Sequence, residues 1–431
     1  MSLTFPRAPV SIPGPVAGPA ATTATAAPTA APTAAPTAAA PTAAAATATA
    51  AATATAVAAT ATAVAATATA APTPRLELSV GAAVERYLTL ASALPGTAVH
   101  YAVKANPHPV LLRALAQAGC RFDVASPAEV RVALEAGAAA SHLVHSNPVA
   151  RRDHLAQAHA LGVRLFVVDS AGEVAKLADA APGSSVLVRI VTSGSGSDWP
   201  LSRKYGCTVD DAVALLVEAA RRGLDPAGVS FHVGSQQRDP HAWGAPIASA
   251  ARVFAAVRAA GYYPWLLDLG GGFPARLDGE PLPIADYGRV IDTHLANSFG
   301  ADRPRTLVEP GRGVVGDAGT VVTSVVGVVD RGGTRWVFVD AGVFTGLVET
   351  LDEAIRYRLE TPDVGGRTGP CVLAGPTCDS ADVLYETTPV WLPLSLAEGD
   401  ELRIHAAGAY STCYSTVGFN GFAPLPTVVL R

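Results

Sequence analysis

The sequence predicts a (β/α)8 barrel followed by an all-β domain, and three observations lead to this fold class. Between about residue 75 and residue 313, short β-branched, apolar runs alternate eight times with alanine-rich stretches. Charged and polar residues cluster where these runs end, at the edge that carries the active site of such barrels. After about residue 314 helical stretches become rare, and strand-like runs follow one another through turns. A doubly wound open sheet is the alternative for the first part.

Residues 1–74 differ from the rest of the 431-residue chain. From residue 20 onward this segment is almost entirely Ala, Thr, Pro and Val, without charge. Such a composition buries too little apolar area to offset its ordering entropy, so we expect a disordered tail. Residues 43–71 are long enough to span a bilayer but lack Leu, Ile and Phe, and Arg7 is the only early basic residue. We therefore expect neither a membrane span nor a secretory signal.

Charge and cysteine usage narrow the class of protein further. The net charge of −5 is small and no basic stripe is present, so nucleic acid is not an expected partner. The five cysteines show no CxxC spacing and no paired framework. This pattern indicates reduced thiols and a cytoplasmic location, and no metal site is expected.

The strand candidates of the first part are short apolar runs typical of buried parallel strands, and the stretches between them have helical spacing. The eight expected strands are residues 98–104, 121–125, 142–145, 164–168, 185–191, 229–233, 265–269 and 306–309, and the expected helices include residues 110–117, 128–135, 151–160, 209–221, 242–259 and 284–297.

The second part, residues 314–431, is expected to form a separate β domain, either a barrel or a sandwich. One helical stretch, residues 346–359, interrupts its strands. The chain thus divides into a tail at 1–74, a barrel at 75–313 and this β domain. The expected strands of the β domain are residues 314–331, 336–341, 371–374, 390–394, 401–406 and 427–430.

Lysine is rare, since only three of the 31 Lys and Arg residues are lysines. One of them, Lys104, ends the apolar run that starts at Tyr101. Arginine stays protonated, whereas a lysine amine can lose its proton and attack a carbonyl. A Schiff base between Lys104 and pyridoxal phosphate is therefore the first functional hypothesis, with a surface lysine as the alternative.

Bare backbone follows the seventh and eighth expected strands. Gly270, Gly271 and Gly272 follow the seventh, and Gly311 and Arg312 follow the eighth. Backbone N–H groups without side chains can approach a phosphate closely, and these two loops form the usual phosphate site of such barrels. A plain tight turn is the alternative interpretation.

Seven motifs occur in the order YAVKANP, FDVAS, FHVGS, LDLGGGFP, EPGR, GPTCDSAD and GAYSTCYSTVGFNGF. Together they resemble the pyridoxal-phosphate decarboxylases of ornithine, diaminopimelate and arginine, which have an alanine-racemase-like barrel. The resemblance runs from about residue 74 to the C-terminus. Each motif alone is weak, and their common order makes the resemblance specific. It implies a pyridoxal-phosphate-dependent decarboxylase, closest to the bacterial ornithine/lysine decarboxylases.

The resemblance implies a role for each matching polar residue. Lys104 would hold the cofactor as an imine, and Glu309 would keep the pyridine nitrogen protonated so that the ring accepts carbanion electrons. His232 would stack on the pyridine face, although a lone histidine in an apolar strand is also typical of a core residue. Asp123 and Arg189 have an ion pair under the barrel rim as their alternative. The implied cofactor contacts are Lys104, Asp123, Arg189, His232, Ser235, Gly270, Gly271, Gly272, Glu309, Gly311, Arg312 and Tyr410.

The resemblance also implies a homodimer with shared active sites. In the family a Cys-Asp pair, here Cys378 and Asp379, enters the site from the partner subunit. A thiol there can reprotonate the α-carbon after carbon dioxide leaves, and Asp379 would hold the terminal ammonium of the substrate. Phe419 and Asn420 match a tail motif near the site. A buried structural cysteine is the alternative for Cys378.

L-ornithine is the expected substrate, and L-lysine is kept as a second one because a pocket discriminates one methylene by only about 1–3 kcal/mol. Residues 346–357 resemble the acidic specificity helix of the bacterial ornithine/lysine enzymes. Glu349 and Asp352, three apart, would share one helix face, unless that face is merely solvated. Arg356 and Arg358 could instead bind a distal carboxylate, which would favour diaminopimelate.

Three other interpretations stay open with less support. An arginine decarboxylase of this fold usually carries inserted segments that are not seen here. A racemase would need a tyrosine base in place of the Cys378 region. A binding protein that has lost catalysis is disfavoured because Lys104, Glu309, Cys378 and Asp379 are all present. Residues 199–206 resemble a loop of the bacterial ornithine/lysine enzymes, and the Gly/Ser-rich stretch before them, residues 193–197, suggests a mobile lid.

Overall fold

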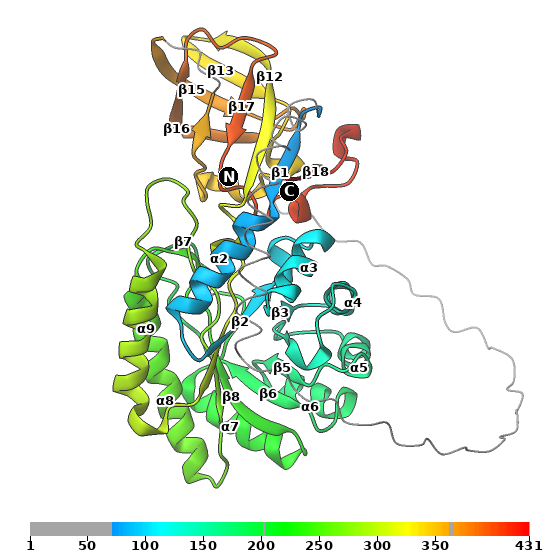
Figure 1. Cartoon of the computed structure of the whole chain (residues 1–431), viewed down its shortest axis with the longest axis vertical. Helices are drawn as coiled ribbons and strands as arrows, with labels where there is room; N and C mark the ends of the chain where they lie inside the picture. Colours follow the sequence, from blue (N-terminus) through cyan, green and yellow to red (C-terminus); the bar gives the residue numbers. More distant parts are fainter. Residues whose placement is uncertain (1–70, 201–202, 362–365, 431) are drawn as a thin grey trace, which may run out of the picture. The chain divides into compact units, whose positions relative to one another are not determined.

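The structure, a computed structural model, describes residues 71–200, 203–361 and 366–430. Within these ranges eight parallel strands close into a barrel in the order β10-β11-β2-β3-β4-β5-β6-β8, and helices surround them (Figure 1). Each strand overlaps an expected run, so the predicted (β/α)8 barrel is confirmed. The barrel strands are β2 (Thr97–Ala102), β3 (Arg121–Val124), β4 (Leu143–His145), β5 (Leu165–Val168), β6 (Ser185–Arg189), β8 (Asp225–Ser230), β10 (Leu266–Asp268) and β11 (Arg305–Val308).

Apolar side chains fill the inside of the barrel. Val144, Val167, Leu187, Leu266 and Leu307, from five different strands, belong to one buried cluster. A barrel packed in this way leaves its strand ends, and not its interior, free for chemistry.

The helices form by the spacing that the sequence predicts, and α7 illustrates this. The Thr208 side chain accepts a hydrogen bond from the backbone N–H of Asp211 and so caps the first turn. Leu215 and Leu216 belong to its buried face. The helices are α2 (Val80–Ala93), α3 (Pro109–Gln117), α4 (Pro127–Glu135), α5 (Arg152–Ala160), α6 (Ala171–Ala180), α7 (Val209–Arg221), α8 (Gly244–Ala259), α9 (Ile284–Phe299) and α10 (Arg312–Val315).

A second sheet forms the β domain, with the strand order β14-β17-β12-β13-β15-β16. Strand β1 (Arg75–Ser79) pairs antiparallel with β12 and parallel with β18. It lies outside the barrel, although the sequence pattern placed the chain from residue 75 in the barrel. The second sheet therefore takes strands from both ends of the described chain. Its other strands are β12 (Gly319–Arg331), β13 (Thr334–Val339), β14 (Leu359–Glu360), β15 (Thr368–Ala374), β16 (Val383–Pro393), β17 (Glu401–Ile404) and β18 (Thr427–Leu430), and a separate ribbon pairs β7 (Ser197–Trp199) with β9 (Ser235–Gln237).

The helix expected at residues 346–359 is wrong. Two 3-10 turns, η5 (Val343–Thr345) and η6 (Val348–Glu353), lie in this region instead. Leu351 has an extended ψ of 136° and Asp352 a φ of +54°, so no helix continues through them. Because the helical backbone is interrupted at Leu351 and Asp352, Glu349 and Asp352 do not share one helix face.

The tail predicted at 1–74 lies outside the described residues up to residue 70. Thr73 is described, and its hydroxyl donates a hydrogen bond to Asp340 Oδ2 at 2.6 Å. Within the described ranges, no helix is both long and apolar enough to cross a membrane.

Candidate active site

Lys104 and Asp123 meet at the carboxyl ends of neighbouring barrel strands. Lys104 lies in the 3-10 turn η1 (Val103–Ala105) after β2, and Asp123 lies in β3. Lys104 Nζ donates to Asp123 Oδ2 at 2.5 Å, and the other oxygen of Asp123 is buried without a partner among the described residues. Burial would lower the pKa of Lys104, but the charge of Asp123, aided by Tyr410 and Glu309, raises it above the usual value. The amine is therefore held as a cation.

A group of buried carboxyls lies beside this lysine. The Ser146 hydroxyl donates a short hydrogen bond to Glu309, which follows β11. Asp268 accepts hydrogen bonds from the Ser230 hydroxyl and from a backbone N–H, both at 2.8 Å. Burial raises the pKa of Asp268 to about 7. Burial, with the charges of Asp268 and Asp123, also raises the pKa of Glu309 well above its usual value. This group can therefore keep a proton at neutral pH.

His232 follows β8 and is neutral. The backbone N–H of Gly234 donates to its Nδ1 at 3.0 Å, so Nε2 carries the proton. Burial lowers the pKa of His232 well below its usual value, and the positive charges of Arg189 and Lys104 act in the same direction. The ring thus offers an uncharged face and one N–H.

The three glycines after β10 are required by their surroundings. Gly270 and Gly272 have φ values of +66° and +107°, in the region that favours glycine. A Cβ atom on Gly271 would lie 2.6 Å from the carbonyl oxygen of Glu309 and 3.0 Å from His232 Nε2. The backbone therefore passes these two residues without room for a side chain.

Arg312 and Glu349 form a buried ion pair at the second expected phosphate loop. Arg312 Nη2 donates to the two carboxylate oxygens of Glu349 at 2.6 and 2.7 Å. Its Nε and Nη2 lie 3.4 and 3.5 Å from the Ser235 hydroxyl, and its guanidinium lies 5.1 Å from the centre of the Tyr410 ring. A Cβ atom on Gly311 would lie 2.8 Å from the Tyr410 hydroxyl oxygen. The sequence did not predict the Arg312–Glu349 contact.

One cavity of about 510 Å³ is lined by Lys104, His232, Glu309 and the Arg312–Glu349 pair. Ser146 and Asn147 also line it, and the sequence did not single them out. Both follow β4 directly, so the rule that polar residues after barrel strands form the site would have found them. The predicted site residues in the cavity lining are Lys104, Arg189, His232, Ser235, Gly272, Glu309, Gly311, Arg312, Glu349 and Tyr410.

The loop expected as a lid, residues 193–206, also contributes to the cavity, and its residues 201–202 lie outside the described ranges. Its strand β7 pairs with β9, which carries a predicted phosphate contact at its first residue. Two cations lie near the Tyr205 ring, with the Arg189 guanidinium at 5.5 Å and Lys204 Nζ at 4.9 Å from its centre. The loop thus brings extra positive charge to the cavity.

Eight predicted site residues do not line this cavity. The backbone N–H and the Sγ of Cys378 donate to Asn420 Oδ1 at 3.1 and 3.4 Å, and Cys378 and Asp379 are exposed. Asp352 is also exposed, whereas Glu349 is buried, so the helix face predicted for these two residues is wrong. The eight residues are Cys378, Asp379, Asn420, Phe419, Asp352, Asp123, Gly270 and Gly271.

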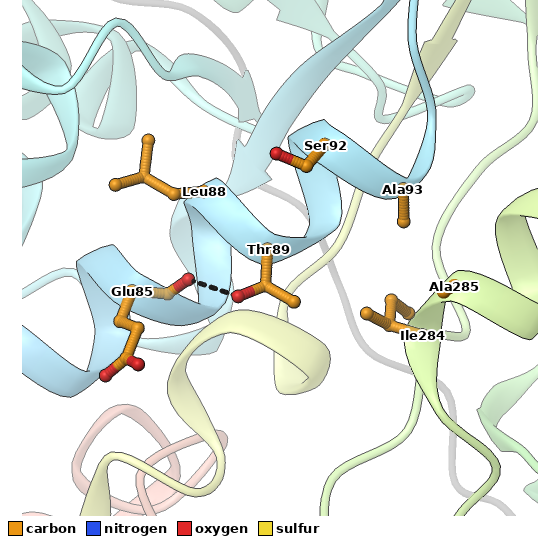
Figure 2. A pocket seen from close by; sticks show the side chains of 7 residues that line it. All are labelled: Glu85, Leu88, Thr89, Ser92, Ala93, Ile284 and Ala285. Carbon is orange, nitrogen blue, oxygen red and sulfur yellow. Dashed lines mark hydrogen bonds between the residues drawn. The ribbon is translucent and has the colours of Figure 1, made fainter.

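A second hollow of about 450 Å³ lies between α2 and the start of α9 (Figure 2). Its one ionisable side chain is Glu85, whose backbone carbonyl accepts a hydrogen bond from the Thr89 hydroxyl at 2.9 Å. A lone exposed carboxylate offers no acid–base pair, so this hollow is not the catalytic candidate. Its lining residues are Glu85, Leu88, Thr89, Ser92, Ala93, Ile284 and Ala285.

The residues of the first cavity fit pyridoxal phosphate. The buried Nη1 of Arg312 has no partner that meets hydrogen-bond geometry among the described residues, and Gly272 and Gly311 line the same cavity with bare backbone that an anion can approach. Lys104 offers the amine for an imine, and Glu309 offers a carboxyl for a ring nitrogen. Each chemical part of the cofactor therefore has a matching group.

Comparison with known proteins agrees with this fit. The family model for the pyridoxal binding domain of pyridoxal-dependent decarboxylases matches residues 80–316. Lysine/ornithine decarboxylase from Selenomonas ruminantium is 35% identical over 363 residues, which are 84% of this chain and 90% of that protein. Antizyme inhibitor 2 from Xenopus laevis is 31% identical over 365 residues, 80% of this chain and 78% of that protein.

The fold comparison extends over the second sheet. The crystal structure of lysine/ornithine decarboxylase from Vibrio vulnificus complexed with cadaverine has a TM-score of 0.78 at 32% identity. The match covers 85% of this chain and 97% of that chain. Both the barrel and the β domain therefore have counterparts in a solved structure.

Proposed function

Because this chain belongs to the pyridoxal-dependent decarboxylases, we propose that its substrate is L-ornithine, converted to putrescine, with L-lysine as a weaker second substrate. The predicted family, enzyme class and cofactor are confirmed by the family match and by the relatives. A basic amino acid is the substrate class that these relatives support. We also propose a cytoplasmic location, since all five cysteines are free thiols.

One observation carries the proposal for a substrate that ends in an ammonium group. Among the described residues that line the cavity, the carboxylates are Glu309 and Glu349, and Ser146 and Arg312 already engage them. Asp379 is exposed and does not line the cavity of its own chain. An acid for the ammonium would therefore come from a second copy of the chain, which supports a homodimer with shared sites.

In this proposal the chain's own residues bind, orient and move protons. Lys104 anchors the cofactor, which supplies an electron sink when carbon dioxide leaves the α-carbon. Glu309 would hold a proton at the ring nitrogen, and His232 would offer its neutral ring to the cofactor. Asp123 orients Lys104 Nζ. Cys378 of the second copy donates the Sγ proton to the α-carbon.

The phosphate end is assigned in the same way. Ser235, Arg312 and Tyr410 would bind the phosphate through side chains, and the glycines after β10 and β11 through backbone N–H groups. Phe419 and Asn420 would lie near the substrate of the second copy, where Asn420 would hold the Cys378 turn in place.

A second candidate substrate is meso-diaminopimelate, and one observation favours it. Arg203 and Lys204 line the cavity, so they could bind a distal carboxylate. The arginines that the sequence suggested for this role do not line the cavity: Arg356 Nη1 pairs with Glu353 at 2.9 Å, and Arg358 is exposed.

The test is carbon dioxide release by purified protein with pyridoxal phosphate, offered L-ornithine, L-lysine, meso-diaminopimelate and L-arginine separately. We expect turnover of ornithine and weaker turnover of lysine. Turnover of diaminopimelate alone would reject the proposal and direct mutagenesis to Arg203 and Lys204. Cofactor binding without turnover of any of the four would point to a non-catalytic homologue, the class that the antizyme inhibitor 2 relative brings into consideration.

A further inference from the structure

Glu349 pairs with the Arg312 guanidinium, the group that would bind an anion in this cavity. Arg312 and Glu349 are 2% and 4% exposed, and Arg312 Nη2 donates to both carboxylate oxygens. The same guanidinium lies within 3.5 Å of the Ser235 hydroxyl and next to the bare backbone of Gly311. Its Nη1 is buried without a partner among the described residues. Glu349 thus neutralises the charge of Arg312 but accepts hydrogen bonds only from its Nη2.

A phosphate and Glu349 cannot both use this cation at full strength. A phosphate monoester carries a charge of about −1.5 to −2 near neutral pH. Two anions a few ångströms apart repel each other strongly at a buried site, where water screens little. One guanidinium compensates one of them, so a phosphate that approaches Arg312 competes with the carboxylate already there.

We propose that the Glu349 carboxylate takes the position of the cofactor phosphate at Arg312 in the cofactor-free chain. Glu349 neutralises Arg312 there, and the phosphate displaces this carboxylate when the cofactor binds. A displaced carboxylate needs a new donor, and the buried hydroxyl of Tyr357, which lies close to the Arg312 guanidinium, makes no other hydrogen bond among the described residues. That hydroxyl lies within the electrostatic reach of Glu349, whose charge adds to burial in raising the pKa of Tyr357. Glu349 therefore lowers the affinity for the cofactor while it keeps the empty site stable. This inference rests on the cofactor of the family and not on the substrate proposed above.

The test is titration of the cofactor-free protein with pyridoxal phosphate and, separately, with pyridoxal, which lacks the phosphate. Binding is followed by the visible absorbance of the bound cofactor. In Glu349→Gln we expect pyridoxal phosphate to bind about tenfold more tightly, a factor that corresponds to about 1.4 kcal/mol. The affinity for pyridoxal is expected to stay unchanged. Glu386→Gln makes the same chemical change at an exposed position of β16 and serves as the matched control.

Weaker or unchanged binding of pyridoxal phosphate by Glu349→Gln would overturn the proposal, because Glu349 would then support Arg312 or play no part. Equal tightening of both ligands would also overturn it, since the effect would not concern the phosphate. Glu349→Asp serves as a second variant in case Glu349→Gln does not fold. It keeps the charge on a shorter side chain, and we expect it to bind pyridoxal phosphate more tightly than the wild type but less tightly than Glu349→Gln. Inorganic phosphate should raise the melting temperature of Glu349→Gln more than that of the wild type. None of these readouts depends on substrate turnover, so they stand apart from the test of the proposed substrate.

Discussion

Asp123 holds Lys104 through a 2.5 Å hydrogen bond between the ends of two neighbouring barrel strands. The aspartate is buried and keeps one oxygen without a partner among the described residues. Its charge raises the pKa of Lys104, so the lysine is protonated in the cofactor-free chain. An ammonium group cannot attack an aldehyde, and cofactor capture therefore requires that this proton leave. Asp123 thus positions the amine at the cost of slowing its deprotonation.

Asp123→Asn tests this relationship. Without the carboxylate charge the pKa of Lys104 falls, so more of the amine is neutral at a given pH. We expect the pH at which the rate of cofactor capture rises to shift down by about one to three units. Stopped-flow absorbance of the cofactor-free protein mixed with pyridoxal phosphate measures this rate. Asp153→Asn, an exposed acid at the start of α5, should leave the profile unchanged; an unshifted profile in Asp123→Asn would show that Asp123 does not control the amine.

Asp268 makes the stability of the cofactor-free chain depend on pH. Its pKa is about 7 in the folded chain against 3.8 for the unperturbed group, so the folded state keeps a proton that the unfolded state loses. Stability from this group is therefore lost as pH rises from about 4 to about 7. We expect Asp268→Asn to melt near the wild-type temperature at pH 4. At pH 7.5 Asp268→Asn should melt at least about 2 °C above the wild type. In a large domain such a shift corresponds to a gain of about 1 kcal/mol in the free energy of unfolding.

The matched control for Asp268 is Glu218→Gln. Glu218 forms an exposed ion pair with Arg222 on α7, and such pairs contribute about 0–1 kcal/mol. The melting temperature of Glu218→Gln should follow that of the wild type at every pH. A wild-type curve and an Asp268→Asn curve that run parallel from pH 4 to 7.5 would mean that Asp268 is ionised throughout.

The barrel could be predicted from the sequence because its signal is local. Each strand is a short apolar run, and several polar site residues lie at or just after the end of such a run, among them Lys104, Asp123 and Glu309. Strand β1 gave no comparable signal. Its five residues pair with β12 and β18, more than 200 positions away, and its charged residues Arg75 and Glu77 are buried only through that pairing.

The path of residues 346–359 could not be predicted for a similar reason. Its spacing is helical, but two long-range contacts determine its path. Glu349 pairs with Arg312, 37 residues away, and the Glu353 carboxylate accepts hydrogen bonds from the backbone N–H groups of residues 386–388. The glycine-rich loops after β10 and β11 and Lys104 lie at the strand ends where the sequence placed them, because bare glycine and a rare lysine need no distant partner to be recognised.

Glu77 anchors strand β1, and its removal should destabilise the fold. One oxygen accepts hydrogen bonds from Arg75 at 2.7 and 3.0 Å, and the other from Arg403 at 2.5 Å. Glu77→Gln would leave two cations without their shared anion, and breaking a buried pair typically costs about 3–5 kcal/mol. Urea unfolding should show a loss of this size. Glu401→Gln removes the more exposed partner of Arg403 and should cost at most about 1 kcal/mol; equal losses in both variants would refute an anchoring role.

Shared active sites predict that two inactive variants restore activity when they are mixed. Lys104→Ala lacks the cofactor anchor, and Cys378→Ala lacks the thiol that we assign to the second copy's site. If Cys378 acts across a homodimer, a mixed dimer contains one site with both defects and one site with neither. Random exchange of subunits should then restore up to about a quarter of the wild-type activity. The measurement is carbon dioxide release from ornithine, or from whichever substrate the four-substrate assay identifies, after the variants are unfolded and refolded together, with each variant refolded alone as the control. Recovery requires that the two residues serve one site from different chains, because the described cavity of one chain contains Lys104 and not Cys378. A mixture no more active than its components, while co-purification of differently tagged variants shows that mixed dimers form, would place both residues in the site of a single chain.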